Sequence, residues 1–221
     1  MTCVILFDVD NTLLDNDAVS RDLREHLTQA LGPECSAEYT KLFEALRREV
    51  GYADYLGALQ RYRAEREHEL GIVGVAEYLL EYPFETRLFP GALDALQAAS
   101  HAGTTAILTD GDIVFQPRKI ARAGLAKAVD GRVLVYIHKE LQLDDVALRL
   151  PADHYVLVDD KLRILDAVKR VWGTKVTTVF VRQGHYAVDP EVLAAYPAAD
   201  VTIERVGDLA HFDWTQVLPR R

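Results

Sequence analysis

The stretch ILFDVDNTLL, residues 5–14, decides the fold of this chain. An apolar run ends at Asp8, a second acid follows at Asp10, and a hydroxyl follows at Thr12. Apolar runs without alternation are typical of strands buried on both faces of a parallel sheet. Open α/β sheets bind their ligands at the carboxyl ends of such strands. The stretch therefore predicts a buried first strand that carries two carboxylates and a hydroxyl to a binding site.

Five further segments share this character, being short, rich in Val, Ile and Thr, and mostly without alternation. They cover residues 104–110, 132–139, 155–160, 175–181 and 200–204. Segments with apolar residues at helical spacing lie between them, at 91–103, 115–125 and 162–173. Such alternation of strands and helices predicts an α/β fold with a doubly wound parallel sheet.

The segment 16–87 interrupts the alternation. It contains no convincing strand, is rich in Leu, Ala, Arg and Glu, and is punctuated by Gly32-Pro33 and Gly51. We expect about four helices there. We interpret 16–87 as a small all-helical cap inserted after the first strand, and 1–15 with 88–221 as the core that carries the site.

Several of the predicted strands end in side chains that can take part in catalysis or bind a metal ion. Thr109-Asp110-Gly111 ends one, Lys139 another, and Asp159-Asp160 a third. Because parallel strands share one carboxyl edge, these residues should converge with Asp8 and Asp10. Unpaired buried charge is costly, so such a cluster needs a purpose. Several carboxylates with oxygen ligands only are what Mg²⁺ prefers.

With these residues in this order, the sequence resembles the haloacid dehalogenase (HAD) superfamily of phosphohydrolases. Residues 8–12, Asp-Val-Asp-Asn-Thr, match its DxDxT motif, and Thr109 with Gly111 matches its hydroxyl motif. Lys139 stands for its lysine motif and Asp159-Asp160 for its terminal acidic pair. The resemblance covers the whole chain. It implies a Rossmann-like core, and the inserted helices resemble the type 1 cap of the superfamily.

The resemblance implies a Mg²⁺-dependent phosphatase that hydrolyses a small phosphorylated metabolite. Asp8 would be the nucleophile that forms an aspartyl-phosphate, and Asp10 would be the general acid and base. The Mg²⁺ ligands would be Asp8, Asp10 through its backbone carbonyl, Asp159 and Asp160. The phosphoryl group would be bound by Thr109, Gly111 and Lys139.

Three positions depart from the family pattern. Asp110 occupies the middle of the hydroxyl motif, Glu140 follows Lys139, and Lys161 follows the acidic pair, where a small residue is usual. These departures leave the subfamily and the substrate open. Lys119 competes with Lys139 for the role of the lysine motif, but Lys119 falls within a predicted helix, so we expect Lys139 to fill it.

Two other functions stay open. One is a phosphomutase of the same fold, and the other is a catalytically idle relative that binds or regulates a partner. A receiver domain is about half as long and lacks an insertion after its first strand. Basic and aromatic residues of the cap could contact the substrate and set specificity. The sequence does not single out any one of the seven candidates, which are Lys41, Arg47, Arg48, Tyr52, Tyr55, Arg61 and Arg63.

Composition limits the kinds of partner and the cellular location that we expect for the chain. The formal net charge is −9 and the pI about 5.3, which argues against nucleic acid as a main partner. No apolar run approaches the ~18 residues that a membrane span requires. Two cysteines, no leader and a core of ordinary size favour a cytoplasmic protein. The sequence does not choose between a monomer and a homodimer.

Overall fold

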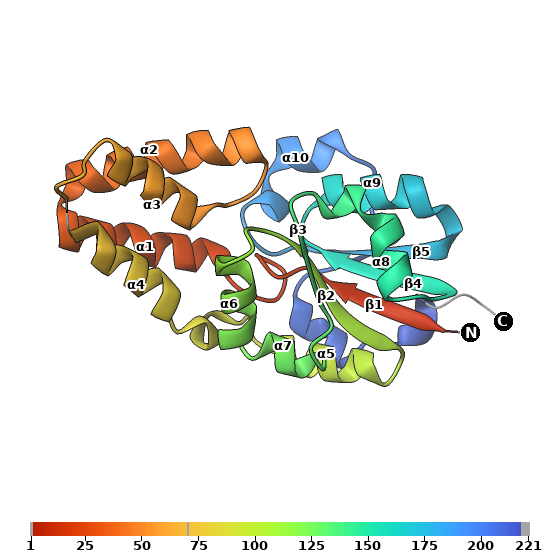
Figure 1. Cartoon of the computed structure of the whole chain (residues 1–221). Coiled ribbons are helices and arrows are strands. Elements are labelled where there is room, and N and C mark those ends of the chain that lie inside the picture. The colour runs from red at the N-terminus through yellow and green to blue at the C-terminus, as the bar shows by residue number, and fades with distance from the viewer. Residues whose placement is uncertain (1, 70, 218–221) are drawn as a thin grey trace.

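The computed structural model describes residues 2–69 and 71–217. Its centre is a sheet of six parallel strands in the order β3-β2-β1-β4-β5-β6 (Figure 1). The strands are β1 Cys3–Phe7, β2 Thr104–Asp110, β3 Val133–Tyr136, β4 His154–Asp159, β5 Val176–Val181 and β6 Val201–Ile203. This order is that of a doubly wound sheet, so the predicted fold class is confirmed.

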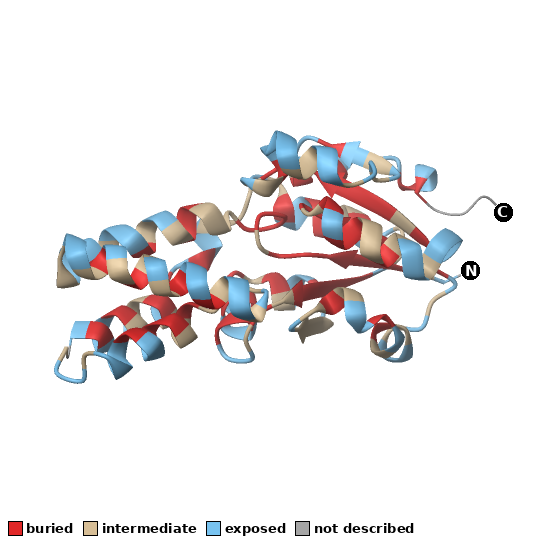
Figure 2. Cartoon of the chain, turned by 90° about the horizontal axis from the view of Figure 1, so that it is seen from above, coloured by how far each residue is buried: buried red, intermediate tan, exposed pale blue. Residues whose placement is uncertain are grey.

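Helices cover both faces of the sheet. One face packs on α5, α6 and α7 and the other on α8 and α9, as the two buried clusters show. The core helices are α5 Ala92–Ser100, α6 Phe115–Arg122, α7 Leu125–Ala128, α8 Leu143–Arg149, α9 Leu162–Trp172 and α10 Pro190–Ala195. Figure 2 shows the buried strands running between helices whose outer faces are exposed. Strands covered on both faces explain the non-alternating apolar runs.

The position of β1 places the site. It is hydrogen-bonded to β2 on one side and β4 on the other, with Phe7 opposite both Ile107 and Val158. Asp8 therefore follows the strand between the two that end in Thr109-Asp110 and Asp159-Asp160. The convergence predicted from the strand ends follows from this register.

Four helices form the inserted segment, at the left in Figure 1: α1 Asn16–Leu31, α2 Pro33–Val50, α3 Tyr55–Ala64 and α4 Gly71–Glu81. Local chemistry sets their ends. The Asp15 side chain accepts from Ala18 N at the start of α1, and Gly51 ends α2 in the left-handed conformation. We call these four helices the cap, and its bounds at 16 and 87 stay a prediction.

The chain enters and leaves the cap through two paired segments. Asp15 N donates to Arg87 O at 2.8 Å, and Phe89 N donates to Leu13 O at 2.9 Å. Leu14 and Leu88 form an antiparallel bridge between these two contacts. The cap is thus joined to the core by a short two-stranded connection.

One predicted strand is shorter than expected. β3 ends at Tyr136, and Lys139 opens a 3₁₀ helix, Lys139–Leu141, rather than closing the strand. Lys139 reaches the site because its backbone N–H is held by Asp110 Oδ1 at 2.7 Å. Within the described residues, no helix is long and apolar enough to cross a membrane.

Candidate active site

Asp8 and Lys139 form the centre of the site. Lys139 Nζ donates to Asp8 Oδ1 at 2.6 Å and lies 2.7 Å from Asp159 Oδ2, with all three side chains almost fully buried. Burial alone would raise the pKa of Asp8, but Lys139 and Lys161 lower it below its usual value. Burial opposes the charge of Lys139, yet Asp159 and Asp8 raise its pKa well above the ordinary value. The pair is therefore a carboxylate and an ammonium.

The second oxygen of Asp8 is free. Asp8 Oδ2 is buried and has no hydrogen-bond partner among the described residues. A buried carboxylate oxygen without a partner is costly unless something else uses it. Asp8 lines the large pocket described below, which places its carboxylate next to the space that a bound molecule would fill.

Asp159 and Asp160 complete an acidic cluster with Asp8. Their carboxylate oxygens lie within 4.8 Å of one another, close enough to share one metal ion. Both oxygens of Asp160 are buried without a hydrogen-bond partner in the described chain. Burial, which outweighs Lys161, raises the pKa of Asp160 well above its usual value. Orphaned carboxylate oxygens in such a set fit a divalent cation.

Asp10 has a partner that the sequence did not indicate. Lys119 Nζ, on α6, donates to Asp10 Oδ1 at 2.7 Å and to Asn16 Oδ1 at 3.1 Å. The Lys119 side chain is 1% exposed and that of Asp10 19%. Lys119 therefore does not replace Lys139 in the cluster around Asp8. It forms a separate ion pair with Asp10.

The hydroxyl residues differ in their surroundings. Thr109 lines the pocket, and its Oγ1 accepts from Gln116 Nε2 at 3.1 Å and donates to Asp110 O in a long contact of 3.4 Å. Gly111 lies close to Gln116, where a Cβ would come within 2.7 Å of the Gln116 side chain. Gly111 does not line this pocket. Thr12 is fully buried, and its Oγ1 has no hydrogen-bond partner among the described residues.

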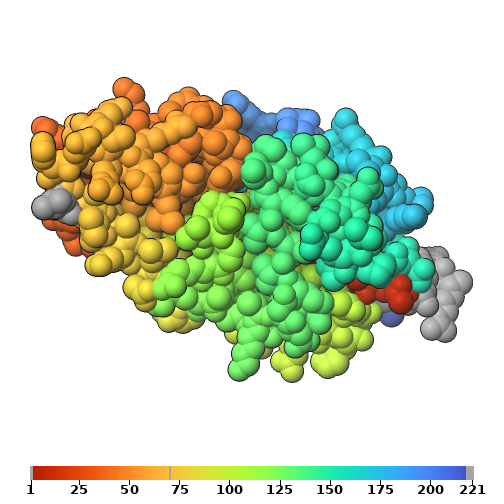
Figure 3. All heavy atoms as spheres, viewed as in Figure 1, coloured from red at the N-terminus to blue at the C-terminus, as the bar shows by residue number. Residues whose placement is uncertain are grey.

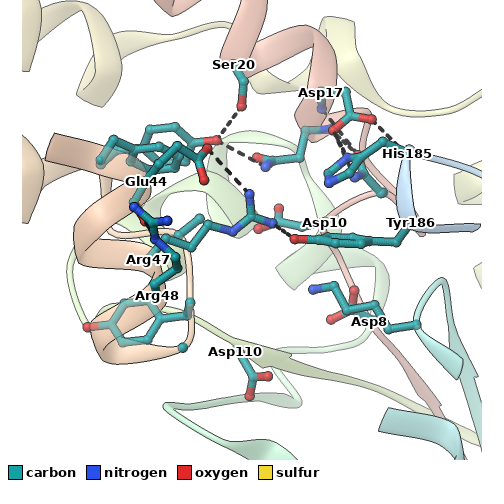
Figure 4. A pocket seen from close by; sticks show the side chains of 18 of the residues that line it. Asp8, Asp10, Asp17, Ser20, Glu44, Arg47, Arg48, Asp110, His185 and Tyr186 are labelled. Carbon is teal, nitrogen blue, oxygen red and sulfur yellow. Dashed lines mark hydrogen bonds and ion pairs between the residues drawn. The ribbon is translucent and has the colours of Figure 1, made fainter. Parts of the chain in front are cut away.

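The pocket lies between the cap and the carboxyl edge of the sheet and encloses about 740 Å³. Figure 3 shows the cap, in orange and yellow, as a lobe beside the core. Asp8, Asp10 and Asp110 line its core side, and Arg47 and Arg48 line its cap side (Figure 4). Of the seven cap residues considered from the sequence, the pocket is lined by Arg47, Arg48, Tyr52 and Tyr55.

A loop after β5 ties the core to the cap. His185 Nδ1 lies 2.7 Å from Asp17 Oδ1 at the start of α1, and Arg47 of α2 donates to Tyr186 Oη (Figure 4). Gly184, at φ +74°, packs so closely on Asn11 that a Cβ would lie 2.5 Å from the Asn11 Cβ. Sequence reasoning assigned no role to Gly184, His185 or Tyr186, because their contacts with the cap and with Asn11 join residues more than 130 positions apart.

Lys161 supplies a second cation to the core wall. Its Nζ lies 5.6 Å from the centre of the Tyr186 ring, and no ion pair within 4.0 Å involves it in the described chain. Burial would lower the pKa of Lys161, but Asp160, Asp8 and Asp159 raise it. The departure noted in the sequence thus places a positive charge in the pocket.

Comparisons with known proteins show the family of the chain. The family model of haloacid dehalogenase-like hydrolases matches residues 4–170, so the chain belongs to that family of hydrolases. A haloacid dehalogenase-like hydrolase from Burkholderia xenovorans is 58% identical, with a TM-score of 0.92 over 96% of this chain and 98% of that one. A search of curated proteins found no match.

More distant solved structures share the fold. L-2-haloacid dehalogenase from Xanthobacter autotrophicus, solved with chloropropionic acid covalently bound, is 18% identical, with a TM-score of 0.62 over 96% of this chain and 98% of that one. A HAD hydrolase from Bacillus subtilis, solved with magnesium, is 17% identical, with a TM-score of 0.64 over 95% and 97%.

These comparisons correct the predicted activity. Several of the similar solved structures are L-2-haloacid dehalogenases, which points to a dehalogenase, so the phosphatase prediction is wrong.

Proposed function

We propose that this hydrolase cleaves the carbon–halogen bond of a small 2-halocarboxylic acid through an ester on Asp8. The observation that carries the proposal is the state of Asp8. Its Oδ1 is neutralised by Lys139 while its Oδ2 is unpartnered at a pocket wall. A carboxylate with one free oxygen is a nucleophile for a polarised carbon.

The first step is a displacement at carbon. A bond forms between Asp8 Oδ2 and the halogen-bearing carbon, the carbon–halogen bond breaks, and the halide leaves with the bonding electron pair. No proton is transferred. The Thr109 hydroxyl, whose oxygen accepts from Gln116, can donate to an anion in the pocket.

The second step hydrolyses the ester. Asp10, which accepts a hydrogen bond from Lys119, takes a proton from water as the water oxygen attacks the carboxyl carbon of Asp8. Lys139 stabilises the negative charge that develops on Oδ1. The bond between that carboxyl carbon and the original Oδ2, which is now attached to the substrate, then breaks. Oδ2 leaves as the hydroxyl oxygen of the 2-hydroxy acid, and Asp10 returns the proton to it. Asp8 releases the second proton of the water and becomes a carboxylate again.

We also propose that Asp8, Asp159 and Asp160 can hold Mg²⁺. The support is the acidic cluster and the two orphaned oxygens of Asp160. The ion would supply positive charge against the three carboxylates. The two steps above do not depend on it, because neither step has to neutralise a dianionic substrate.

The test is halide release from L-2-chloropropionate, measured with a chloride electrode in buffer containing EDTA. Asp8→Asn should lose the activity, and Asp144→Asn, which removes an exposed acid on α8, should keep it. A single turnover in H₂¹⁸O adds a second readout. The label should enter the Asp8 carboxylate, found by mass spectrometry of its peptide, and the 2-hydroxy acid should carry unlabelled oxygen.

Two results would overturn the proposal. One is label in the hydroxy acid rather than in Asp8, which would mean direct attack by water. The other is Mg²⁺-dependent release of phosphate from an aryl phosphate, lost in Asp8→Asn, together with no halide release from a panel of 2-chloro, 2-bromo and 2-fluoro acids.

A further inference from the structure

Two pocket cations, one from the core and one from the cap, lie against the same aromatic ring. Lys161 Nζ is 5.6 Å from the centre of the Tyr186 ring, and the Arg47 guanidinium carbon is 5.3 Å from it. Arg47 also donates to Tyr186 Oη. Cations placed within about 6 Å of an aromatic ring centre are held there without being neutralised. Tyr186 therefore keeps both charges in the pocket.

Lys161 forms no close ion pair with a described carboxylate, although Asp160, Asp8 and Asp159 act on its charge from farther away. Lys139 is engaged by Asp8 and Asp159, and Arg163 by Glu140 at 2.7 Å. Lys161 Nζ forms no ion pair within 4.0 Å with any described residue, although Lys161 lines the pocket. Arg47 has only a loose pair with Glu44, at 3.8 Å. These two cations are thus free to meet an anion.

An anionic substrate needs such charge. Asp8 and Asp10 both line the pocket as carboxylates and repel a substrate carboxylate. The halogen-bearing carbon is bonded to the substrate carboxylate. Attack by Asp8 on that carbon therefore requires the substrate carboxylate to lie close to Asp8 despite the repulsion. A lysine directly after Asp159-Asp160 offers a cation beside Asp8 that is not consumed by the nucleophile's own ion pair.

We propose that Lys161 and Arg47 form a two-cation site that binds the carboxylate of the substrate, with Tyr186 as the positioning residue between them. Lys161 is then the residue that selects a carboxylic acid over a neutral haloalkane. Arg47 joins from the cap, so the site is complete only while the cap contacts the loop that carries Tyr186. This inference rests on the proposed function for its substrate, and on the two cation–ring contacts for its geometry.

The experiment measures binding of propionate, which has the carboxylate but no halogen and cannot react. Titration calorimetry of the full chain in EDTA gives the dissociation constant. Lys161→Met should weaken binding by about 10- to 100-fold, the size of a charge-assisted contact. Lys127→Met, which removes an exposed lysine of α7, should leave it unchanged. Lys161→Arg should retain most of the affinity.

Tyr186 separates a binding role from a structural one. Tyr186→Phe keeps the ring and loses the hydroxyl that receives Arg47, whereas Tyr186→Leu loses both. Propionate affinity should fall further in Tyr186→Leu than in Tyr186→Phe, with unchanged melting temperature in Lys161→Met as a check on folding. Equal affinity of wild type and Lys161→Met, or no binding by wild type, would overturn the site. Binding that depends on Lys161 without halide release from any 2-haloacid would keep the site and remove the proposed reaction.

Discussion

Lys119 and Asp10 form an ion pair, 2.7 Å from Nζ to Oδ1, that also reaches the cap. The same ammonium donates to Asn16, the first residue of α1. One nearly inaccessible lysine of α6 thus fixes both the loop after β1 and the start of the cap. Its two partners lie more than 100 residues away in sequence.

This pair should respond unequally to loss of either partner. Asp10→Asn leaves a buried ammonium without its counter-ion and should cost about 3 to 5 kcal/mol of unfolding free energy. Lys119→Met leaves a carboxylate that keeps partial contact with water and should cost about 1 to 3 kcal/mol. Denaturant unfolding measures both. A double variant less destabilised than Asp10→Asn alone would confirm the coupling, and strictly additive losses would contradict it.

Loss of the nucleophile should stop turnover while the fold persists. We expect Asp8→Asn to lower the rate of halide release by on the order of 10³-fold or more. Because the isosteric amide keeps a contact to Lys139, cooperative thermal unfolding should remain. A variant with near-wild-type activity would show that Asp8 does not attack the substrate.

Metal binding should stabilise the chain through Asp160. We expect Mg²⁺ to raise the melting temperature, since an ion that binds only the folded state adds about 2.7 kcal/mol at about 100 times its Kd. The rise should vanish in Asp160→Asn and persist in Asp144→Asn. Differential scanning fluorimetry with and without EDTA measures the melting temperature of all three proteins. An equal rise in all three would mean that the ion binds elsewhere.

The contact between Asp17 and His185 should make the joint of cap and core sensitive to acid. Burial would raise the pKa of Asp17, but its hydrogen bonds with His185 and Asn11 lower it below the usual value. A lowered pKa in the folded state contributes stability above the unfolded pKa of about 4, and that stability is lost as pH falls through the folded pKa.

Asp17→Asn tests that contribution. The variant should be less stable than wild type by about 0.2 to 1 kcal/mol near neutral pH, because the pair is partly exposed. The gap should shrink as pH falls below about 4. Thermal unfolding of both proteins across the pH range measures it. A gap that widens in acid would mean that Asp17 is not held in its charged form.

Much of this fold could be predicted because its strands are covered on both faces. Six non-alternating runs gave six parallel strands, and the register of β1 between β2 and β4 brought Asp8 beside Asp159 and Asp160. The end of β3 was misplaced because the apolar run continues through Ile137 after pairing has stopped at Tyr136. Sequence pattern records burial better than it records hydrogen bonding.

The contacts of the site were harder to predict. Lys119 has helical spacing, so its sequence context indicates only that it lies on α6, and packing alone directs it to Asp10. His185 and Tyr186 look like solvated loop residues until the cap is folded against them. The reaction was mispredicted for a chemical reason, since an aspartate nucleophile can attack either phosphorus or carbon.

The paired entry and exit segments of the cap have an evolutionary consequence. Leu14 and Leu88 bridge each other, so the chain leaves the core and returns to it at nearly one point. A gene segment encoding those helices could be lengthened, shortened or exchanged for another without changing the order of the strands in the sheet. Substrate preference can then change through the cap alone, while the acids at the ends of β1 and β4 keep their positions.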